Sequence, residues 1–218
     1  MSVDAKLSDS AMFQIMLLVT EAKSCVIQEL QARSLYSHGI ATGSGTDQIT
    51  VISNTDSQTA IDDVQRDSEF AKSVVQLMKE ALREAFDRQS GMTPKAQWDP
   101  LVLMSRFNMD AIRDEIRFPA TMDELLAALQ EIREDPYLTT MVSAIMNIAD
   151  DVRNGLVSEQ EGVKAAMAIC EGAVLDKITD PVERLRLDDS ETVIDLLSYV
   201  SALKLMEVVR KRRVADEQ

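Results

Sequence analysis

The chain has 218 residues, a formal net charge of −14 and a hydrophobic fraction of 45%, so it holds enough apolar material for a folded core. The acidic balance argues against nucleic acid or an anionic membrane surface as a partner, because both need clustered Lys and Arg. Aromatic residues make up only 4% while methionines number 12, a mixture that favours helices over β-sandwiches.

The two cysteines, Cys25 and Cys170, each fall within an apolar helical pattern and are expected to be buried thiols. Because the sequence has neither a C-x-x-C pair nor a Cys/His cluster, it predicts no metal site and no cofactor. The N-terminus lacks the basic and apolar regions of a targeting signal, and no uninterrupted apolar segment has the length to span a bilayer. We therefore expect a cytoplasmic protein without a membrane partner.

The first long helix is predicted from about Asp9 to Gln31, after a strand remnant in residues 1–6. Ser8 is a typical N-cap, and Leu7 and Met12 occupy the positions of a hydrophobic staple. A second apolar face of this helix holds Leu17, Leu18, Cys25 and also Glu21. The main apolar face follows the helical period and comprises Met12, Ile15, Met16, Val19, Ala22, Val26, Ile27 and Leu30.

Glu21 stands out because a carboxylate among apolar positions must be desolvated, paired or placed at the edge of a cleft. Burial would favour its protonated form and suit it to acid–base work. An ion pair with a Lys or Arg of another element is the alternative. The residue pattern by itself is compatible with both.

Residues 41–48, Ala-Thr-Gly-Ser-Gly-Thr-Asp-Gln, are the most distinctive stretch of the chain. Two glycines separated by one serine let the backbone turn tightly, adopt positive φ and come close to a ligand. The apolar run Ile49, Val51 and Ile52 that follows predicts a buried strand. A polar glycine loop before such a strand is typical of a ligand site, and equally of a simple turn. Residues 33–40, just upstream, are read as a loop or a short strand.

Residues 53–67 are rich in Asp, Ser, Thr and Gln and are predicted to form a loop. A second long helix should start near Ser68 and end at Gly91, before Pro94. Its apolar residues keep helical spacing and should cover one face of the small sheet. They are Phe70, Val74, Leu77, Met78, Ala81, Leu82, Ala85 and Phe86.

Strand signals vanish after Gly91, and residues 91–100 form the best candidate boundary. We predict an α/β domain over residues 1–92, built from a small partial sheet and two long helices. An all-α helical bundle should follow over residues 93–218. The chain as a whole should be predominantly helical.

The predicted bundle is indicated by a long apolar final helix, a heptad seam and a series of helix caps. The final helix, about Asp189 to Arg213, is apolar over a wide arc and should be buried on two sides. Its basic tract Arg210–Arg213 would complement the helix dipole. A bundle seam is predicted by Leu138, Met141, Ile145, Ile148 and Val152. The caps are Asp99 before Pro100, Thr121 with Glu124, Asp135 before Pro136, and Ser158 with Glu161.

Four segments of the first domain occur in an order that points to a known family: Leu7-Ser-Asp-Ser-Ala11, Thr20-Glu-Ala-Lys23, Ile27-Gln-Glu-Leu30 and residues 41–48. Together they resemble the C-terminal half of the adenosylcobinamide amidohydrolase family, over residues 3–89. The resemblance implies hydrolysis of the amide that joins the propionyl arm of adenosylcobinamide to aminopropanol. Adenosylcobyric acid and the free amino alcohol would be the products, in corrinoid salvage.

An unactivated amide needs an aimed nucleophile, donors for the oxyanion and an acid for the leaving amine. Thr46 or Ser44 would attack or bind, Asp47 or Glu21 would act as base, and Lys23 would balance charge or polarise the carbonyl. The corrinoid would be a substrate or ligand, not a cofactor. By position in the matching motifs, the catalytic candidates are Glu21, Lys23, Thr46 and Asp47, and the substrate-binding candidates are Thr42, Gly43, Ser44 and Gly45.

The resemblance also has departures. The family domain is about as long as this whole chain, so its first half, with central strands and part of the pocket, has no counterpart here. The chain has Asp67-Ser-Glu-Phe-Ala71 where many members have a small or His-containing segment. His38, the single histidine, could meet a corrinoid's cobalt or cap a loop, and it lies outside the matching motifs.

Three functional readings follow from the sequence. The first is an amidohydrolase-like enzyme, or part of one, acting on corrinoid amides. The second is a non-catalytic relative that serves as a corrinoid-binding or helical dimerisation module. The third is a helical interaction protein whose glycine loop only turns a corner. Because a half-sheet leaves an open edge and an uncovered face, we expect a homodimer, or cover from the helical half of the chain.

Overall fold

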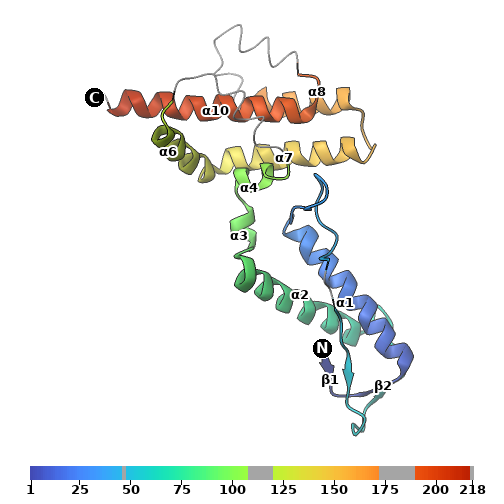
Figure 1. The fold of residues 1–218 in the computed structure, drawn as a ribbon. Helices are drawn as coiled ribbons and strands as arrows, with labels where there is room; N and C mark the ends of the chain where they lie inside the picture. Colours follow the sequence, from blue (N-terminus) through green and yellow to red (C-terminus); the bar gives the residue numbers. More distant parts are fainter. Residues whose placement is uncertain (46–47, 108–119, 172–189, 217–218) are drawn as a thin grey trace. The chain divides into compact units, whose positions relative to one another are not determined.

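Helices dominate the computed structural model, which describes residues 1–45, 48–107, 120–171 and 190–216 (Figure 1). Within these residues, strands occur only before α2, and every element that follows is helical. The predicted fold class, a small partial sheet with two long helices followed by a helical bundle, is confirmed. The chain divides into two units, Met1–Gln97 and Trp98–Gln218.

The first unit contains two very short parallel ladders. Strand β1 (Ser2–Val3) pairs with β3 (Ile52–Ser53), and β2 (Lys6–Leu7) pairs with β4 (Ala60–Ile61). Parallel neighbours need a crossover of a dozen residues or more, and helix α1 (Asp9–Glu29) supplies it for both ladders. The sheet is therefore organised by the helix that connects its strands.

The strand predicted after the glycine loop is shorter and less buried than expected. Only Ile52 and Ser53 are in strand conformation, and the Ile52 side chain is 57% exposed. The expectation of a buried strand was wrong, because a ladder of two strands offers the apolar side chains no second layer on that face. Strand β4 also lies inside residues 53–67, which were expected to form a loop throughout.

Helix α1 begins as the sequence predicts. The Ser8 hydroxyl accepts a hydrogen bond from the Ala11 N–H at 3.1 Å. Both predicted apolar faces contribute to the core of the first unit, where Ile15 and Val19 of the main face and Leu18 of the second face share one cluster with Ala71 and Val74 of α2 (Glu69–Ser90). Helix α2 is capped by Ser68 and ends at Gly91 in the left-handed conformation, φ +66°, as its sequence predicts.

Two expectations about α1 need correction. By length and composition, residues 9–29 could cross a membrane, although no uninterrupted apolar segment of that length was expected. Core helices of soluble proteins pass the same test, and 39% of the apolar window is buried here. Cys25 was expected to be a buried thiol but is exposed, because it lies beside the core-facing side of the helix and not on it. Cys170 is buried as expected.

The predicted apolar stripe of α2 is only partly covered. Ala71 and Val74 are buried, whereas Leu77, farther along the helix, is 60% exposed. The fully buried apolar contact of α2 within its unit is thus made by its first turns, against α1. The first unit consequently leaves apolar side chains open on both of its long helices.

The second unit is a helical bundle whose caps match the sequence. Asp99 caps α4 (Pro100–Met104), and Asp135 caps α7 (Pro136–Arg153) with a proline at the first helical position. Thr121 and Glu124 form a reciprocal capping box at α6 (Met122–Arg133). Ser158 and Glu161 form a second reciprocal capping box at the start of α8 (Glu159–Glu171). The Ser158 N–H donates to Glu161 Oε2 at 3.0 Å, and the Glu161 N–H donates to Ser158 Oγ at 3.3 Å.

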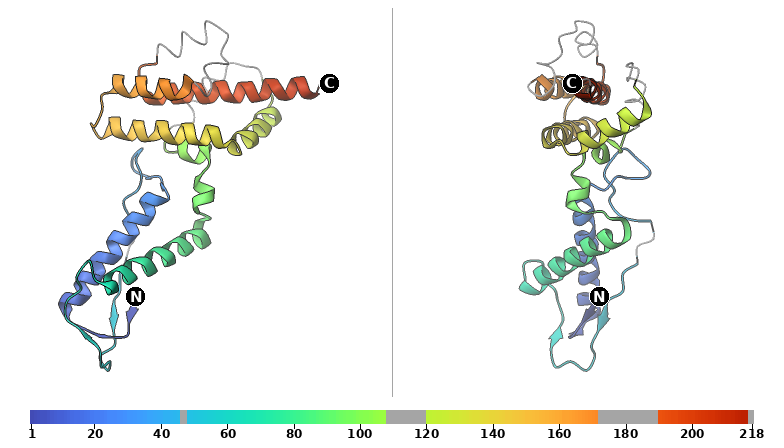
Figure 2. Two further views of the ribbon diagram at one scale, coloured as in Figure 1. Left: turned by 180° about the vertical axis from the view of Figure 1, so that it is seen from behind. Right: turned by 90° about the vertical axis from the view of Figure 1, so that its left-hand side faces the viewer.

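Helix α10 (Val193–Asp216) is the centre of this unit. All residues from Leu196 to Leu203 are buried, so the prediction of a helix covered on more than one side is confirmed. Helices α7, α8 and α10 run side by side in both views of Figure 2 and share one core. The predicted seam residues Leu138, Met141 and Ile145 belong to that core. Asp189, the predicted start of this final helix, lies outside the described residues.

The basic end of α10 is engaged with the acidic helix α6. Arg213 makes two hydrogen bonds to the Glu124 carboxylate, of 2.5 and 3.0 Å, and Arg212 lies 3.4 Å from Glu131. The Arg213 guanidinium, followed by the Thr121 capping contacts, lowers the pKa of Glu124 to about 2. The tract thus contributes to packing within the bundle, in addition to its favourable place at a helix C-terminus.

Gly162 of α8 marks a close helix contact. A methyl group added there would lie 2.6 Å from Val152 Cγ2 and 3.0 Å from Val193 Cγ2. Both neighbours are β-branched and have little rotamer freedom in a helix. The substitution Gly162→Ala should therefore destabilise the second unit by about 1–3 kcal/mol despite the better helix propensity of Ala. Denaturant unfolding followed by circular dichroism measures this change.

Gln160→Ala is the matched control, because Gln160 is an exposed residue of the same helix. Its effect should stay within about 0.5 kcal/mol. The truncation Val152→Ala should cost less in the Gly162→Ala background than alone, because it makes room for the added methyl. A Gly162→Ala protein more stable than the parent would contradict the close contact.

Candidate active site between α1 and α2

A strip of three polar side chains runs along α1 beside its core face. Glu21, Cys25 and Glu29 follow one another at intervals of four residues and so lie on one side of the helix. This is the side predicted as the second apolar face of the helix. In the structure it borders α2, and each of its carboxylates meets a cation from that side.

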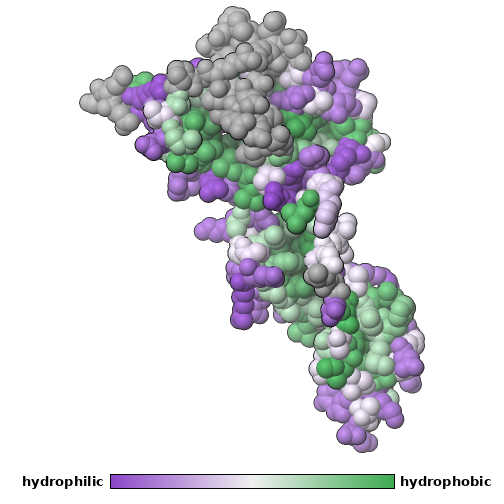
Figure 3. All heavy atoms as spheres, in the orientation of Figure 1, coloured by the Kyte–Doolittle hydropathy of each residue, from purple (hydrophilic) through white to green (hydrophobic). Residues whose placement is uncertain are grey.

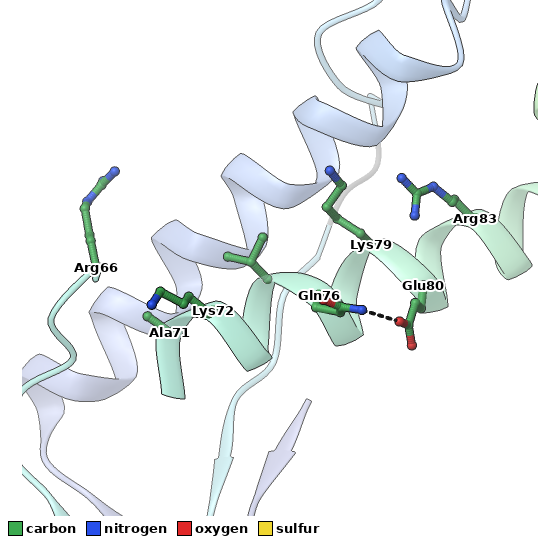
Figure 4. A pocket seen from close by; sticks show the side chains of 8 residues that line it. Arg66, Ala71, Lys72, Gln76, Lys79, Glu80 and Arg83 are labelled. Carbon is green, nitrogen blue, oxygen red and sulfur yellow. Dashed lines mark hydrogen bonds between the residues drawn. The ribbon is translucent and has the colours of Figure 1, made fainter. Parts of the chain in front are cut away.

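The opposing side is a cationic hollow of about 450 Å³ along α2 (Figure 4). Four basic side chains line it, namely Arg66, Lys72, Lys79 and Arg83, together with Gln76 and Glu80. Lys79 extends toward α1 in Figure 4. The volume falls within the range of small-molecule sites, although the hollow is open to solvent. Each of these cations is paired with a carboxylate: Arg66 with Glu21, Lys72 with Glu69, and both Lys79 and Arg83 with Glu29.

Cys25, Glu29 and Lys79 are in mutual contact at one end of the strip. The Cys25 thiol donates to Glu29 Oε1 at 3.2 Å, and Lys79 Nζ lies 3.3 Å from Cys25 Sγ. Lys79 also forms a short ion pair with Glu29. Arg83 Nη2 completes the group, 2.5 Å from Glu29 Oε2. A nucleophilic atom, a carboxylate and two cations are therefore assembled from two helices.

The charges of this group determine the protonation of Glu29. The hydrogen bond from Lys79, with further contributions from Cys25 and Arg83, lowers the pKa of Glu29 from 4.5 to about 2. The same Glu29 carboxylate, followed by Cys25, raises the pKa of Lys79. Near neutral pH, Glu29 is thus a carboxylate and Lys79 an ammonium ion. The group is therefore a carboxylate held between two cations, which keep it ionised.

Glu21 occupies the other end of the strip. Its two carboxylate oxygens accept hydrogen bonds from Arg66 at 2.6 and 3.1 Å. The Glu21 side chain is 49% exposed, so the alternative of a buried carboxyl is wrong. The other alternative from the sequence, an ion pair with a Lys or Arg of another element, is the one that the structure shows. Since Arg66 lines the hollow, the pair lies at its edge.

The glycine loop is attached to α1 next to this strip. Ser24 Oγ donates to the Thr42 carbonyl at 3.0 Å, and Gln28 Nε2 donates to the Ala41 carbonyl at 3.0 Å. Ser24 and Gln28 each precede a strip residue, so the loop-binding face of α1 adjoins the strip. The substrate-binding candidates Thr42, Gly43, Ser44 and Gly45 are all exposed there. Thr46 and Asp47, two of the catalytic candidates, lie outside the described residues.

The glycines of this loop have a different role from the one expected. Among the described glycines, positive φ occurs at Gly91 and Gly155 and not in residues 41–45. A methyl group added at Gly45 would meet no atom within 4 Å. The space next to Gly45 is therefore open. The left-handed conformation expected for the glycines of this loop is not found in residues 41–45. His38 is exposed in the preceding turn, between the bridge partners Arg33 and Ile40.

Lys23 is half-buried and lies on α1 away from the strip, because it is two residues from both Glu21 and Cys25. The structure thus brings Cys25 and Glu29 together with Lys79 and Arg83 of α2, and it pairs Glu21 with Arg66 just before that helix. It anchors the glycine loop beside them. The contacts among Cys25, Glu29 and Lys79 were not predicted from the sequence. Their signal was present as a Cys and a Glu four residues apart, and as the spacing of the basic residues of α2, Lys72, Lys79 and Arg83.

Comparison with known proteins agrees with the resemblance of the first domain. Residues 1–94 match the family model of adenosylcobinamide amidohydrolase. The matched segment contains α1, the glycine loop, α2 and every residue of the strip and the hollow. No curated protein and no solved structure matches the chain.

The low pKa of Glu29 predicts how the stability of the first unit depends on pH. Folding lowers this pKa from 4.5 to about 2, so the contribution of Glu29 is fully present above pH 4.5 and is lost as pH falls toward 2. The variant Glu29→Gln should therefore lose less stability than the parent over this interval. Thermal unfolding at a series of pH values, in low salt, measures the difference.

Glu84→Gln is the control, because Glu84 forms only an exposed pair with Arg88 on α2. Its acid dependence should follow that of the parent chain. The ion-pair group would be contradicted if Glu29→Gln and the parent lost the same stability between pH 4.5 and 2.

Proposed function

We propose that this protein hydrolyses the aminopropanol amide of adenosylcobinamide and yields adenosylcobyric acid, as a step of corrinoid salvage. The observation that carries this proposal is the match of residues 1–94 to the adenosylcobinamide amidohydrolase family. The matched segment includes the candidate site between α1 and α2. In this proposal the corrinoid is the substrate and the protein needs no further cofactor.

The cationic hollow suits an amide hydrolysis on chemical grounds. Attack on an amide carbonyl creates an oxyanion, and hydrolysis leaves a carboxylate, so negative charge develops at the same atoms in both states. Donors such as the Lys79 ammonium and the Arg83 guanidinium stabilise such charge when they are already in position. A volume of about 450 Å³ can take a propionyl arm with its amide, while the corrin ring stays outside.

The candidates from the sequence motifs take supporting roles in this proposal. Thr42 to Gly45 would bind the amide arm beside α1, where open space lies above Gly45. Glu21 and Arg66 would close one end of the hollow. Asp47 and Thr46 are proposed to act at the same loop, and Lys23 to balance charge nearby. Each assignment follows from position in the matched motifs.

Incubation of the purified chain with adenosylcobinamide tests the function. We expect adenosylcobyric acid and free aminopropanol in equal amounts, identified by mass spectrometry. The double variant Glu21→Gln, Asp47→Asn should lose roughly a hundredfold or more of this rate if its carboxylates take part in acid–base steps. Glu84→Gln, an exposed carboxylate on the same unit, should keep the parent rate.

Binding of adenosylcobinamide without product would contradict hydrolysis and favour a corrinoid-binding module. Calorimetry distinguishes that outcome from a lack of binding. A double variant that binds and hydrolyses the corrinoid like the parent would contradict the assignment of Glu21 and Asp47. Thermal unfolding of each variant shows whether a lost rate only reflects lost structure.

We further propose that the chain forms a homodimer through the uncovered side of α1. Phe13, Met16 and Leu17 lie one turn apart there, and Phe13 is 62% exposed. The visible surface over this part of α1 is largely hydrophobic (Figure 3). Exposed contiguous apolar side chains of this kind usually serve contacts with other molecules.

Sedimentation equilibrium should give a dimer mass for the parent chain and a monomer mass for the variant Phe13→Ser, Leu17→Ser. The matched control is Leu156→Ser, Val157→Ser, because this pair is also exposed and apolar but lies in the turn before α8. A monomeric parent chain at micromolar concentration would contradict the dimer.

A further inference from the structure

We propose that the tip of a β-hairpin directly after α1 is the contact for the corrin ring of the substrate. The inference rests on the proposed function and assigns Leu35 and Tyr36 to substrate binding and specificity. The amide arm would enter the hollow, while the ring, which is too large for it, would lie against this tip. Neither residue lines the hollow itself.

Residues 32–41 form the hairpin. The Ala41 N–H donates to the Ala32 carbonyl at 2.7 Å, and the Ser34 N–H donates to the Gly39 carbonyl at 2.9 Å. Ala32 and Gly39 are both buried, so the base of the hairpin belongs to the folded part of the first unit. The tip that this base carries is therefore held at a defined place beyond the end of α1.

The tip is fixed by local hydrogen bonds although its side chains are open to solvent. The Ser34 hydroxyl accepts a hydrogen bond from the Tyr36 N–H at 3.1 Å, and the Ser37 hydroxyl accepts one from the Gly39 N–H at 3.2 Å. Leu35 and Tyr36 are 78% and 95% exposed, more than the other large apolar side chains described in the first unit. An apolar pair on an ordered backbone loses little freedom when a ligand covers it.

The hairpin connects two parts of the candidate site. Before it, Glu29 near the end of α1 pairs with Lys79 and Arg83 of the hollow. After it, the chain enters the glycine loop, where the Ala41 and Thr42 carbonyls accept hydrogen bonds from α1. Along an extended chain, the tip is no more than roughly 17 Å from this loop. That reach is comparable with the width of a substituted corrin ring.

The size and chemistry of the substrate favour such a contact. The hollow, at about 450 Å³, has room for one amide arm, so the macrocycle must be bound by a surface outside it. A corrin ring carries methyl groups and amide arms around its edge. The apolar bodies of Leu35 and Tyr36 can cover the methyl groups, and the Tyr36 hydroxyl can hydrogen-bond an amide arm. The tip thus offers both kinds of contact that the ring presents.

Binding of adenosylcobyric acid tests the ring contact apart from hydrolysis. This corrinoid keeps the ring and lacks the scissile amide, so calorimetry with the full chain measures binding of the ring alone. The double variant Leu35→Ser, Tyr36→Ser should weaken binding by roughly tenfold or more, because the apolar contact is lost. Tyr36→Phe keeps the aromatic body and should stay within about threefold of the parent affinity.

Leu126→Ser, Tyr137→Ser is the matched control, because it removes the same residue types from exposed positions of the second unit. It should bind adenosylcobyric acid like the parent chain. Circular dichroism and the thermal midpoint show whether each variant is folded. Equal affinity of the parent chain and the tip variant would overturn the ring contact. A tip variant that changes the sedimentation mass but keeps the corrinoid affinity would overturn it too, since the tip would then bind protein.

Kinetics with adenosylcobinamide separate this inference from the proposed function. The tip variant should raise KM and keep kcat, because the tip holds the ring and takes no part in the reaction. If the parent chain hydrolyses the corrinoid and the tip variant has the same KM, the ring contact is wrong and the proposed function stands. If the parent chain binds adenosylcobyric acid through the tip but forms no product from adenosylcobinamide, the ring contact stands and hydrolysis is wrong. A parent chain that binds neither corrinoid would overturn both.

Discussion

The packing of α1 against α2 is the contact on which the first unit depends. Its ladders have only two residues per strand, so they cannot hold two helices in place by themselves. The buried side chains at the contact, among them Ile15 and Val74, contribute about 1.5–3 kcal/mol each through burial of apolar surface. This contact fixes the distance between the strip on α1 and the cations on α2. The candidate site is therefore built at the margin of a helix pair, and the sheet has a secondary part in it.

The ion pairs at this margin have two consequences. They orient long side chains that would otherwise move freely, and they hold the Lys79 ammonium 3.3 Å from the Cys25 sulfur. Exposed ion pairs contribute little to stability, so we expect these pairs to add less to folding than the apolar contact between the two helices. The pair of Arg106 with Asp150 in the bundle is a contrast, because the Arg106 side chain is buried and the Asp150 side chain is largely shielded from solvent.

Local features of the fold could be predicted from the sequence, and features that depend on neighbours could not. The caps at Ser8, Ser68 and Asp135 involve residues within one turn, so the sequence contains the whole interaction. The burial of Ile52 depends on how many strands and layers adjoin it, which no local pattern states. The position of Cys25 was misjudged for the same reason, because a helix that is apolar on two sides does not reveal which side its partner will cover.

The matched motifs located the glycine loop and α1, and the structure adds why they lie together. Ser24 and Gln28 bind loop carbonyls while the next residue of each pair faces α2, so one helix holds the loop and the thiol strip at once. Any change in the helix contact would alter the distance of Cys25 from Lys79, but it would leave the loop contacts of α1 intact. The geometry of the thiol is thus more sensitive to the packing of α2 than the loop is. A small shift of α2 would therefore change the contacts of Cys25 and Glu29 with Lys79, while the glycine loop would keep its place on α1.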